Sequence, residues 1–180
     1  MEKSLSVETR KMCKEIWKER IDEFYKIFVE SLDLVNSRDS ALCLGARYGE
    51  EAEAAKKIFN KVEAIDLVEY SPLVKIGDMH NLEFPTRSFD LIYTNALDHS
   101  ISPLKVIKEC YRVSRNKGIF IVDIKIRNKG RYDVVRFDDE IKFKKMFSRH
   151  FKLIKEKNLD NHEREILFGL SNRYFWRKDE

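Results

Sequence analysis

The segment ALCLGARYGEEAEAA, residues 41–55, carries the clearest indication of the fold. An apolar run breaks at Gly45 and Gly49 and becomes charged and alanine-rich, which predicts a strand, a tight turn and a helix start. Gly45 can adopt positive φ and, without a Cβ, lets a ligand approach the backbone. The start of the helix would face that ligand with free N–H groups, which suits a nucleotide-like cofactor. The GxxxG spacing differs from the GxGxxG of dinucleotide enzymes, so an ordinary turn also explains it.

The composition indicates one globular domain. The 180 residues are 43% hydrophobic and 37% charged, which suits a single domain with a sizeable core. No apolar run is long enough to span a bilayer, and the N-terminal segment MEKSLSVETRK lacks the apolar core of a signal peptide, so we expect a cytoplasmic protein. Cys13, Cys43 and Cys110 show no CxxC spacing and favour reduced thiols, and the four scattered histidines form no metal motif.

Positive charge is concentrated toward the C-terminal end. Residues 125–180 contain 16 Lys and Arg against 10 Asp and Glu, whereas the first 124 residues contain 19 against 21. This asymmetry suggests an acidic substrate or nucleic acid, although a solvated lysine-rich face also explains it. The segment KIRNKGR, residues 125–131, follows a predicted strand and could receive an anionic substrate, but no base-stacking motif supports nucleic acid.

Strand and helix patterns alternate along the chain, which predicts a mostly parallel α/β sheet. The first element is a long amphipathic helix over residues 7–34, capped by Ser6, with Trp17 and Phe24 on its apolar stripe. Strands are expected over residues 40–44, before Asp66, before Asp78, over residues 88–95 and over residues 118–124. A helix is expected over residues 49–60, and a second from Ser102 to near Asn116, before a turn at Gly118.

Two regions depart from a regular alternation. Only eleven residues separate Asp66 from Asp78, too few for a full crossover helix, so the second crossover is abbreviated. After the fifth strand, FDDEIKFKKMFSRHF predicts a helix with Ile141, Phe143 and Phe147 on its apolar side. The runs FKLIKEKNL and REILFGLSNRYFWRK, separated by the polar DNHE, predict a closing antiparallel hairpin.

Polar side chains follow the carboxyl ends of successive predicted strands, where open α/β sheets bind ligands. Asp66 is placed like the carboxylate that accepts both hydroxyls of a ribose. Asp78 could accept from an exocyclic adenine amine, with Met79 covering the ring, and Asn95 ends the fourth strand. Each residue singly also suits a helix cap or a polar loop position, but together they predict one shared adenosine site.

The chain resembles the class I S-adenosylmethionine-dependent methyltransferases, in particular the group called type 11. The resemblance covers about residues 40–124, through the segments ALCLGARYG, AIDL, GDMHNLEFPTRSFDLIYTNALDHS and LKVIKECYRVSRNKGIFIVDI. It implies a single-domain Rossmann-like sandwich that ends in an antiparallel strand, S-adenosylmethionine as the cofactor, and methyl transfer. The expected division is an N-terminal helical segment (1–38), a cofactor-binding core (39–124) and a C-terminal helix and hairpin (125–180).

The resemblance also implies roles for individual residues. The methionine part of the cofactor would lie against Gly45, Ala46 and Gly49, with Asn95 beneath its amino-acid end. The ribose and adenine would be held by Asp66, Leu67, Asp78 and Met79.

Two positions depart from the family pattern. Cys43 stands where the family usually has an acidic residue, which removes a partner for the cofactor's ammonium group. Arg47 stands where a third glycine is usual. Its bulk and positive charge close to the sulfonium could be unfavourable, or its guanidinium fork could pair with the cofactor's carboxylate.

The acceptor is not evident from the sequence and could be a small molecule or a macromolecule. Methyl transfer from a sulfonium needs mainly alignment, but a hydroxyl nucleophile would benefit from a base. His99, with Asp98 beside it, is the candidate base, although a loop histidine without a catalytic role fits as well. A non-catalytic scaffold that retains the fold is the main alternative, favoured by Cys43 and Arg47. A nicotinamide oxidoreductase is a third, disfavoured by the glycine spacing.

Overall fold

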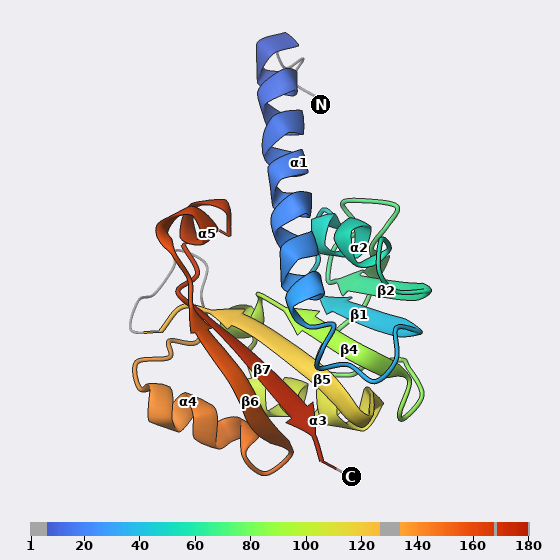
Figure 1. Ribbon diagram of the computed structural model, residues 1–180, viewed down its shortest axis with the longest axis vertical. Coiled ribbons are helices and arrows are strands. Elements are labelled where there is room, and N and C mark those ends of the chain that lie inside the picture. The colour runs from blue at the N-terminus through green and yellow to red at the C-terminus, as the bar shows by residue number, and fades with distance from the viewer. Residues whose placement is uncertain (1–6, 127–133, 168, 180) are drawn as a thin grey trace.

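A seven-stranded mixed sheet forms the centre of the structure, a computed structural model that describes residues 7–126, 134–167 and 169–179 (Figure 1). The strands lie in the order β3-β2-β1-β4-β5-β7-β6. The pairs from β3 to β5 are parallel, and β7 runs antiparallel to both β5 and β6. The strands are β1 Ser40–Leu44, β2 Lys61–Asp66, β3 Lys75–Ile76, β4 Phe89–Thr94, β5 Ser114–Ile124, β6 Phe151–Asn158 and β7 Asn172–Lys178. The predicted mostly parallel sheet with an antiparallel C-terminal hairpin is confirmed.

Helices cover both faces of this sheet. They are α1 Val7–Glu30, α2 Glu50–Ala55, α3 Pro103–Val113, α4 Glu140–Phe147 and α5 Asn161–Ile166, with a 3₁₀ turn, η1, at Leu97–His99. On β1, Ala41 and Cys43 belong to the apolar cluster that includes α1 and α2, whereas Leu42 and Leu44 belong to the cluster that includes α3 and α4. Because both faces are covered, β1 and β4 are buried along their whole length. No helix in the described part of the chain is long and apolar enough to cross a membrane.

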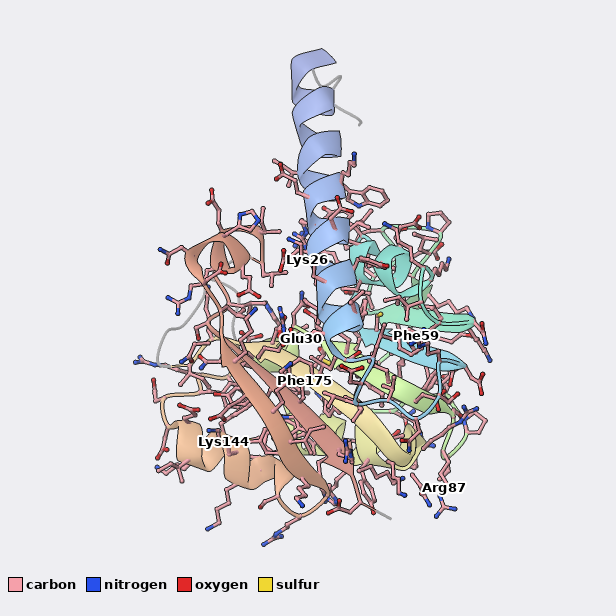
Figure 2. All side chains as sticks on the ribbon, viewed as in Figure 1. Lys26, Glu30, Phe59, Arg87, Lys144 and Phe175 are labelled. Atoms are coloured by element: carbon pink, nitrogen blue, oxygen red, sulfur yellow. The ribbon has the colours of Figure 1, made fainter. Side chains whose placement is uncertain are left out.

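α1 packs on the sheet with its C-terminal half and extends past it with its N-terminal half (Figure 1). Phe24 and Phe28 are buried, and both rings lie 5.6 Å from the Tyr93 ring. Phe59 and Phe175 belong to the same cluster and lie near the C-terminal end of α1 (Figure 2).

Two details of the predicted helix differ in the structure. Trp17 remains 39% exposed, so its expected packing is wrong, because α1 is longer than the surface beneath it. α1 ends at Glu30, and residues 31–34 form a turn. The predicted cap, Ser6, lies outside the described residues.

Several boundaries within residues 39–124 also differ from the prediction. α2 ends at Ala55, five residues earlier than expected, and β3 ends two residues before Asp78. Residues 67–74 contain turns and no helix, which confirms the abbreviated crossover. The predicted turn at Gly118 is wrong, because α3 ends at Val113 and β5 begins at once by pairing Ser114 with Phe89. The register between β4 and β5 shifts after that pair, which accommodates the extra residues of β5.

The C-terminal hairpin contains a helix that was expected to be strand. The REI of the predicted second strand lies in α5, and only Asn172–Lys178 pairs with β6. Asp160 accepts the N–H of Glu163, whose carboxylate accepts the N–H of Asp160, so the two residues form a capping box. This capping box lies in the polar segment DNHE, residues 160–163, which the sequence analysis interpreted as the turn between the two strands of the hairpin. On α4, Phe143 and Phe147 are buried as predicted, but Ile141 is 79% exposed, so its predicted place on the apolar side is wrong.

Candidate active site

A cavity of about 500 Å³ opens at the carboxyl ends of β1, β2 and β4. The chain leaves β1 toward β2 on one side and returns to β4 on the other, so the strand order reverses here, where open α/β sheets bind ligands. The predicted residues that line this cavity are Gly45, Ala46, Arg47, Asp66, Leu67, Asp78, Met79, Asn95, Asp98 and His99. Gly49 does not line it; with φ 90° it occupies the N-cap position of α2 and shapes the turn.

The turn after β1 brings the backbone close to the neighbouring strand. Gly45 has φ 69°, and a Cβ added to it would lie 2.5 Å from the Cβ of Ala96. The N–H groups of Gly45 and Ala46 donate to the carbonyl of Ile65 at 2.9 and 3.1 Å. A larger residue at position 45 would therefore push the ends of β1 and β4 apart.

Asp66 lies at the end of β2 and anchors the same turn. Its Oδ2 accepts the N–H of Arg47 at 3.0 Å, and its Oδ1 accepts the N–H of Val68 at 3.3 Å. Each carboxylate oxygen can accept a further hydrogen bond. Asp66 thus keeps acceptor capacity toward the cavity.

Asp78 is held by His80, which the sequence analysis did not single out. The backbone N–H of His80 donates to Asp78 Oδ1 at 2.8 Å, and its ring Nδ1 lies 2.6 Å from the same oxygen. The ring Nε2 lies 2.7 Å from the hydroxyl of the buried Ser100. Hydrogen bonding from the His80 backbone, together with its side chain, lowers the pKa of Asp78, so this carboxylate remains ionised.

A buried acidic pair at the start of α2 forms another wall of the cavity. Glu50 forms an ion pair with Arg20 of α1 at 3.2 Å, and both side chains are buried. Asn95 Nδ2 donates to Glu51 Oε1 at 3.3 Å, while Glu51 Oε2 is buried without a hydrogen-bond partner in the described structure. Burial, and then the nearby charge of Glu50, raise the pKa of Glu51 to about 8. The sequence analysis did not name Glu50 and Glu51 as site residues. Their position directly after Gly49, at the start of the helix that follows β1, could have indicated that they line the site.

The two departures from the family pattern occupy different places in the structure. Cys43 is fully buried in the apolar cluster under α1 and does not line the cavity. Burial raises the pKa of its thiol, and the nearby Glu51 raises it further. Arg47 lines the cavity, with its guanidinium over the rings of Tyr48 and Tyr70 at 5.2 and 5.7 Å. The side chain therefore leaves the cavity open.

His99 and Lys125 line the same cavity. His99 Nε2 lies 3.6 Å from the carboxylate of the buried Asp98. Lys125 follows β5 directly and is half-buried, and its ammonium pairs with no carboxylate in the described structure. Residues 127–131 of the predicted basic segment lie outside the described residues. The described residues contain no cluster of His, Cys, Asp and Glu able to hold a metal ion.

The reversed sheet, the glycine turn and the row of acidic residues agree with the arrangement expected of a class I S-adenosylmethionine-dependent methyltransferase, whose cofactor is S-adenosylmethionine. Residues 42–122, which are 81 of the 180 residues, match the model of the family described as "Methyltransferase domain". The predicted family, activity class and cofactor are thereby confirmed. The residues present fit the cofactor, because the cavity is lined by Asp66, which keeps acceptor capacity, by the ionised Asp78 and by Glu51, whose buried Oε2 has no hydrogen-bond partner in the described structure.

Solved structures share this fold at low sequence identity. A methyltransferase of Clostridium acetobutylicum is 16% identical with a TM-score of 0.68, covering 91% of this chain and 92% of its own. A chain from the complex of the Haloferax volcanii Trm112 methyltransferase activator is 14% identical with a TM-score of 0.67, covering 91% and 94%. The [4+2]-cyclase SpnF is 14% identical with a TM-score of 0.69, covering 88% and 80%. These likenesses establish the fold alone, and no curated protein matched the sequence.

Proposed function

We propose that the chain transfers the methyl group of S-adenosylmethionine to a small anionic acceptor that binds beside Lys125. The observation that carries this proposal is the half-buried Lys125 ammonium, which lines the cavity without a carboxylate partner in the described structure. A cation held there favours a carboxylate or phosphate, because an opposite charge offsets its loss of hydration. Ile101, Leu167 and Leu170 line the cavity as well and suit an acceptor with an apolar body.

The predicted cofactor residues have separate roles in this proposal. Asp66 accepts the ribose hydroxyls with the acceptor capacity that its two backbone hydrogen bonds leave. The ionised Asp78 accepts from the adenine amine, and Leu67 and Met79 flank the ring. Arg47, which has no ion-pair partner in the described structure, binds the cofactor's carboxylate.

His99 is the proposed base for an acceptor that must lose a proton. Its side chain is 45% exposed and close enough to the buried Asp98 for that carboxylate to orient and stabilise the charged imidazole. The bound cofactor supplies an activated methyl group, and the protein's own residues align the acceptor and remove its proton.

The experiment measures S-adenosylhomocysteine release from a panel of small hydroxy and amino acids and from their neutral amides. We expect turnover of acids but not of amides. Lys125→Gln should raise KM for the best acid at least ~10-fold, the typical cost of losing one charged hydrogen bond, with kcat little changed. The matched control Lys152→Gln removes an exposed lysine on β6 and should leave KM unchanged.

A second variant tests the base. His99→Ala should lower kcat by about 10²-fold or more, as for the loss of a general base.

Turnover of amides as readily as acids, or an unchanged KM in Lys125→Gln, would contradict the anionic acceptor. Cofactor binding without turnover of any acid would contradict it as well and would favour the scaffold alternative.

A further inference from the structure

Glu51 presents an unused acceptor to the cavity. It is 3% exposed, and its position in the first turn of α2 is fixed by the left-handed Gly49 that precedes it. One carboxylate oxygen accepts from Asn95, and the other, Oε2, has no hydrogen-bond partner in the described structure. Buried polar atoms in native proteins nearly always have a partner, so a donor from a ligand is the natural complement.

The surrounding charges indicate that this donor is a cation. Arg20, whose charge also acts on Glu51, forms its ion pair with Glu50. The Arg47 guanidinium lies over two tyrosine rings instead. Glu51 therefore has an acidic neighbour and no cation of its own in the described structure, and a positively charged donor would satisfy both its charge and its free oxygen.

We propose that Glu51 binds the ammonium group of the cofactor's methionine part and replaces the carboxylate that position 43 lacks. This inference rests on the proposed function, because it assumes that the cavity holds the cofactor. Cys43 is buried outside the cavity and cannot supply the charge, whereas Glu51 lies close enough to raise the pKa of the Cys43 thiol.

Binding of an ammonium group here would release a proton. In the free protein Glu51 is mostly protonated at pH 7, because its pKa is raised to about 8 by burial and by Glu50. The bound cation favours the ionised carboxylate, so the affinity should rise with pH up to about 8, by at most about tenfold per unit. The other ionisable groups near Glu51 or around the cavity are Arg20, Cys43, Arg47, Tyr48, Glu50, Asp66, Asp78, His80, Tyr93, Asp98, His99 and Lys125.

The test compares two adenosine ligands by isothermal titration calorimetry of the full chain. S-adenosylhomocysteine carries the ammonium group, and 5′-methylthioadenosine lacks the whole amino-acid part. We expect Glu51→Gln to weaken S-adenosylhomocysteine binding at least ~10-fold, as for a lost charged hydrogen bond, and to abolish proton release measured in buffers of different ionisation enthalpy. Its affinity for 5′-methylthioadenosine should equal that of the wild type.

Glu53→Gln on the same helix, at a residue that does not line the cavity, is the matched control and should behave as the wild type. Equal loss of both ligands in Glu51→Gln, or unchanged affinity and proton release with S-adenosylhomocysteine, would overturn the inference while the proposed function stands. Failure of the wild type to bind either ligand would overturn both, so the two failures are distinguishable.

Discussion

Two buried carboxyl groups show how the environment of one residue decides its chemistry. Asp123 on β5 is fully buried, and its two oxygens accept from Arg173 at 2.7 and 2.9 Å and from Tyr93 at 3.0 Å. Glu51 is nearly as buried, but in the described structure its Oε1 accepts from Asn95 while its Oε2 has no hydrogen-bond partner. Asp123 therefore has a structural role, whereas Glu51 has free binding capacity.

Replacement of Glu51 should stabilise the ligand-free protein at alkaline pH. Its folded-state pKa is raised from 4.5 to about 8, so between these values the folded state holds a proton that the unfolded state releases. Stability is therefore lost as pH rises through this window. Relative to wild type, Glu51→Gln should gain on the order of a few kcal/mol at pH 8 and little at pH 5. Urea unfolding at both pH values measures this, and an equal effect at the two would refute the pKa assignment.

At the scale of single elements, α1 changes character along its length. Its C-terminal half carries buried aromatic side chains that pack on the sheet, whereas Trp17 and Ile16 in its other half are 39% and 47% exposed. Burial of apolar side chains stabilises the fold, so the C-terminal half of α1 should contribute more to the free energy of unfolding than the N-terminal half.

Alanine substitutions along α1 should reproduce this unevenness. Phe24→Ala removes a fully buried ring beside Tyr93 and should cost about 3–5 kcal/mol of unfolding free energy. Trp17→Ala should cost less than about 1 kcal/mol, as is usual for exposed positions. Chemical denaturation measures both variants, and similar losses would show that Trp17 is packed in solution.

The antiparallel strand β7 is attached to β5 by a buried ion pair in register. Asp123 and Arg173 lie directly opposite each other, and the guanidinium binds the carboxylate with two hydrogen bonds. Arg173→Met leaves the Asp123 charge buried without its partner and should cost about 3–5 kcal/mol. The control Arg149→Met, at an exposed position, should change stability by less than about 0.5 kcal/mol. Urea unfolding compares them, and a loss in Arg173→Met no larger than in the control would contradict this role.

At the scale of the whole molecule, the reversed strand order places segments from across the chain around one cavity. Its lining extends from Arg20 on α1 to Leu170 near β7. A ligand that fills this cavity therefore contacts many elements at once and stabilises the folded chain as a unit.

Ligand-dependent thermal unfolding tests this whole-molecule behaviour. S-adenosylhomocysteine should raise Tm increasingly with concentration, equivalent to about 2.7 kcal/mol at 100 times its Kd. NAD should leave Tm unchanged, because the turn after β1 lacks the GxGxxG pattern. Stabilisation by NAD alone would contradict the assignment of the cavity.

Much of this architecture follows from local patterns in the sequence. Apolar runs and glycine breaks predicted the central strands, and the eleven residues between Asp66 and Asp78 predicted the missing crossover helix. The order of strands and helices then brought Asp66, Asp78 and Asn95 to one edge, as expected from a parallel sheet. These features depend on hydrophobic periodicity and on the lengths of short segments, and both can be read from residues that are close together in the sequence.

Other features arise only when distant segments meet. Trp17 and Ile141 have the periodicity of core residues, yet they remain 39% and 79% exposed in the described structure. Glu50 and Glu51 look like ordinary acidic residues at a helix start, but both are buried beside α1, and Arg20 forms its ion pair with Glu50. The sequence alone predicts the sheet, the resemblance to the methyltransferases and the edge at which Asp66, Asp78 and Asn95 meet. The tertiary structure decides which carboxylate stays unpaired, because burial and pairing depend on contacts between residues far apart in the chain.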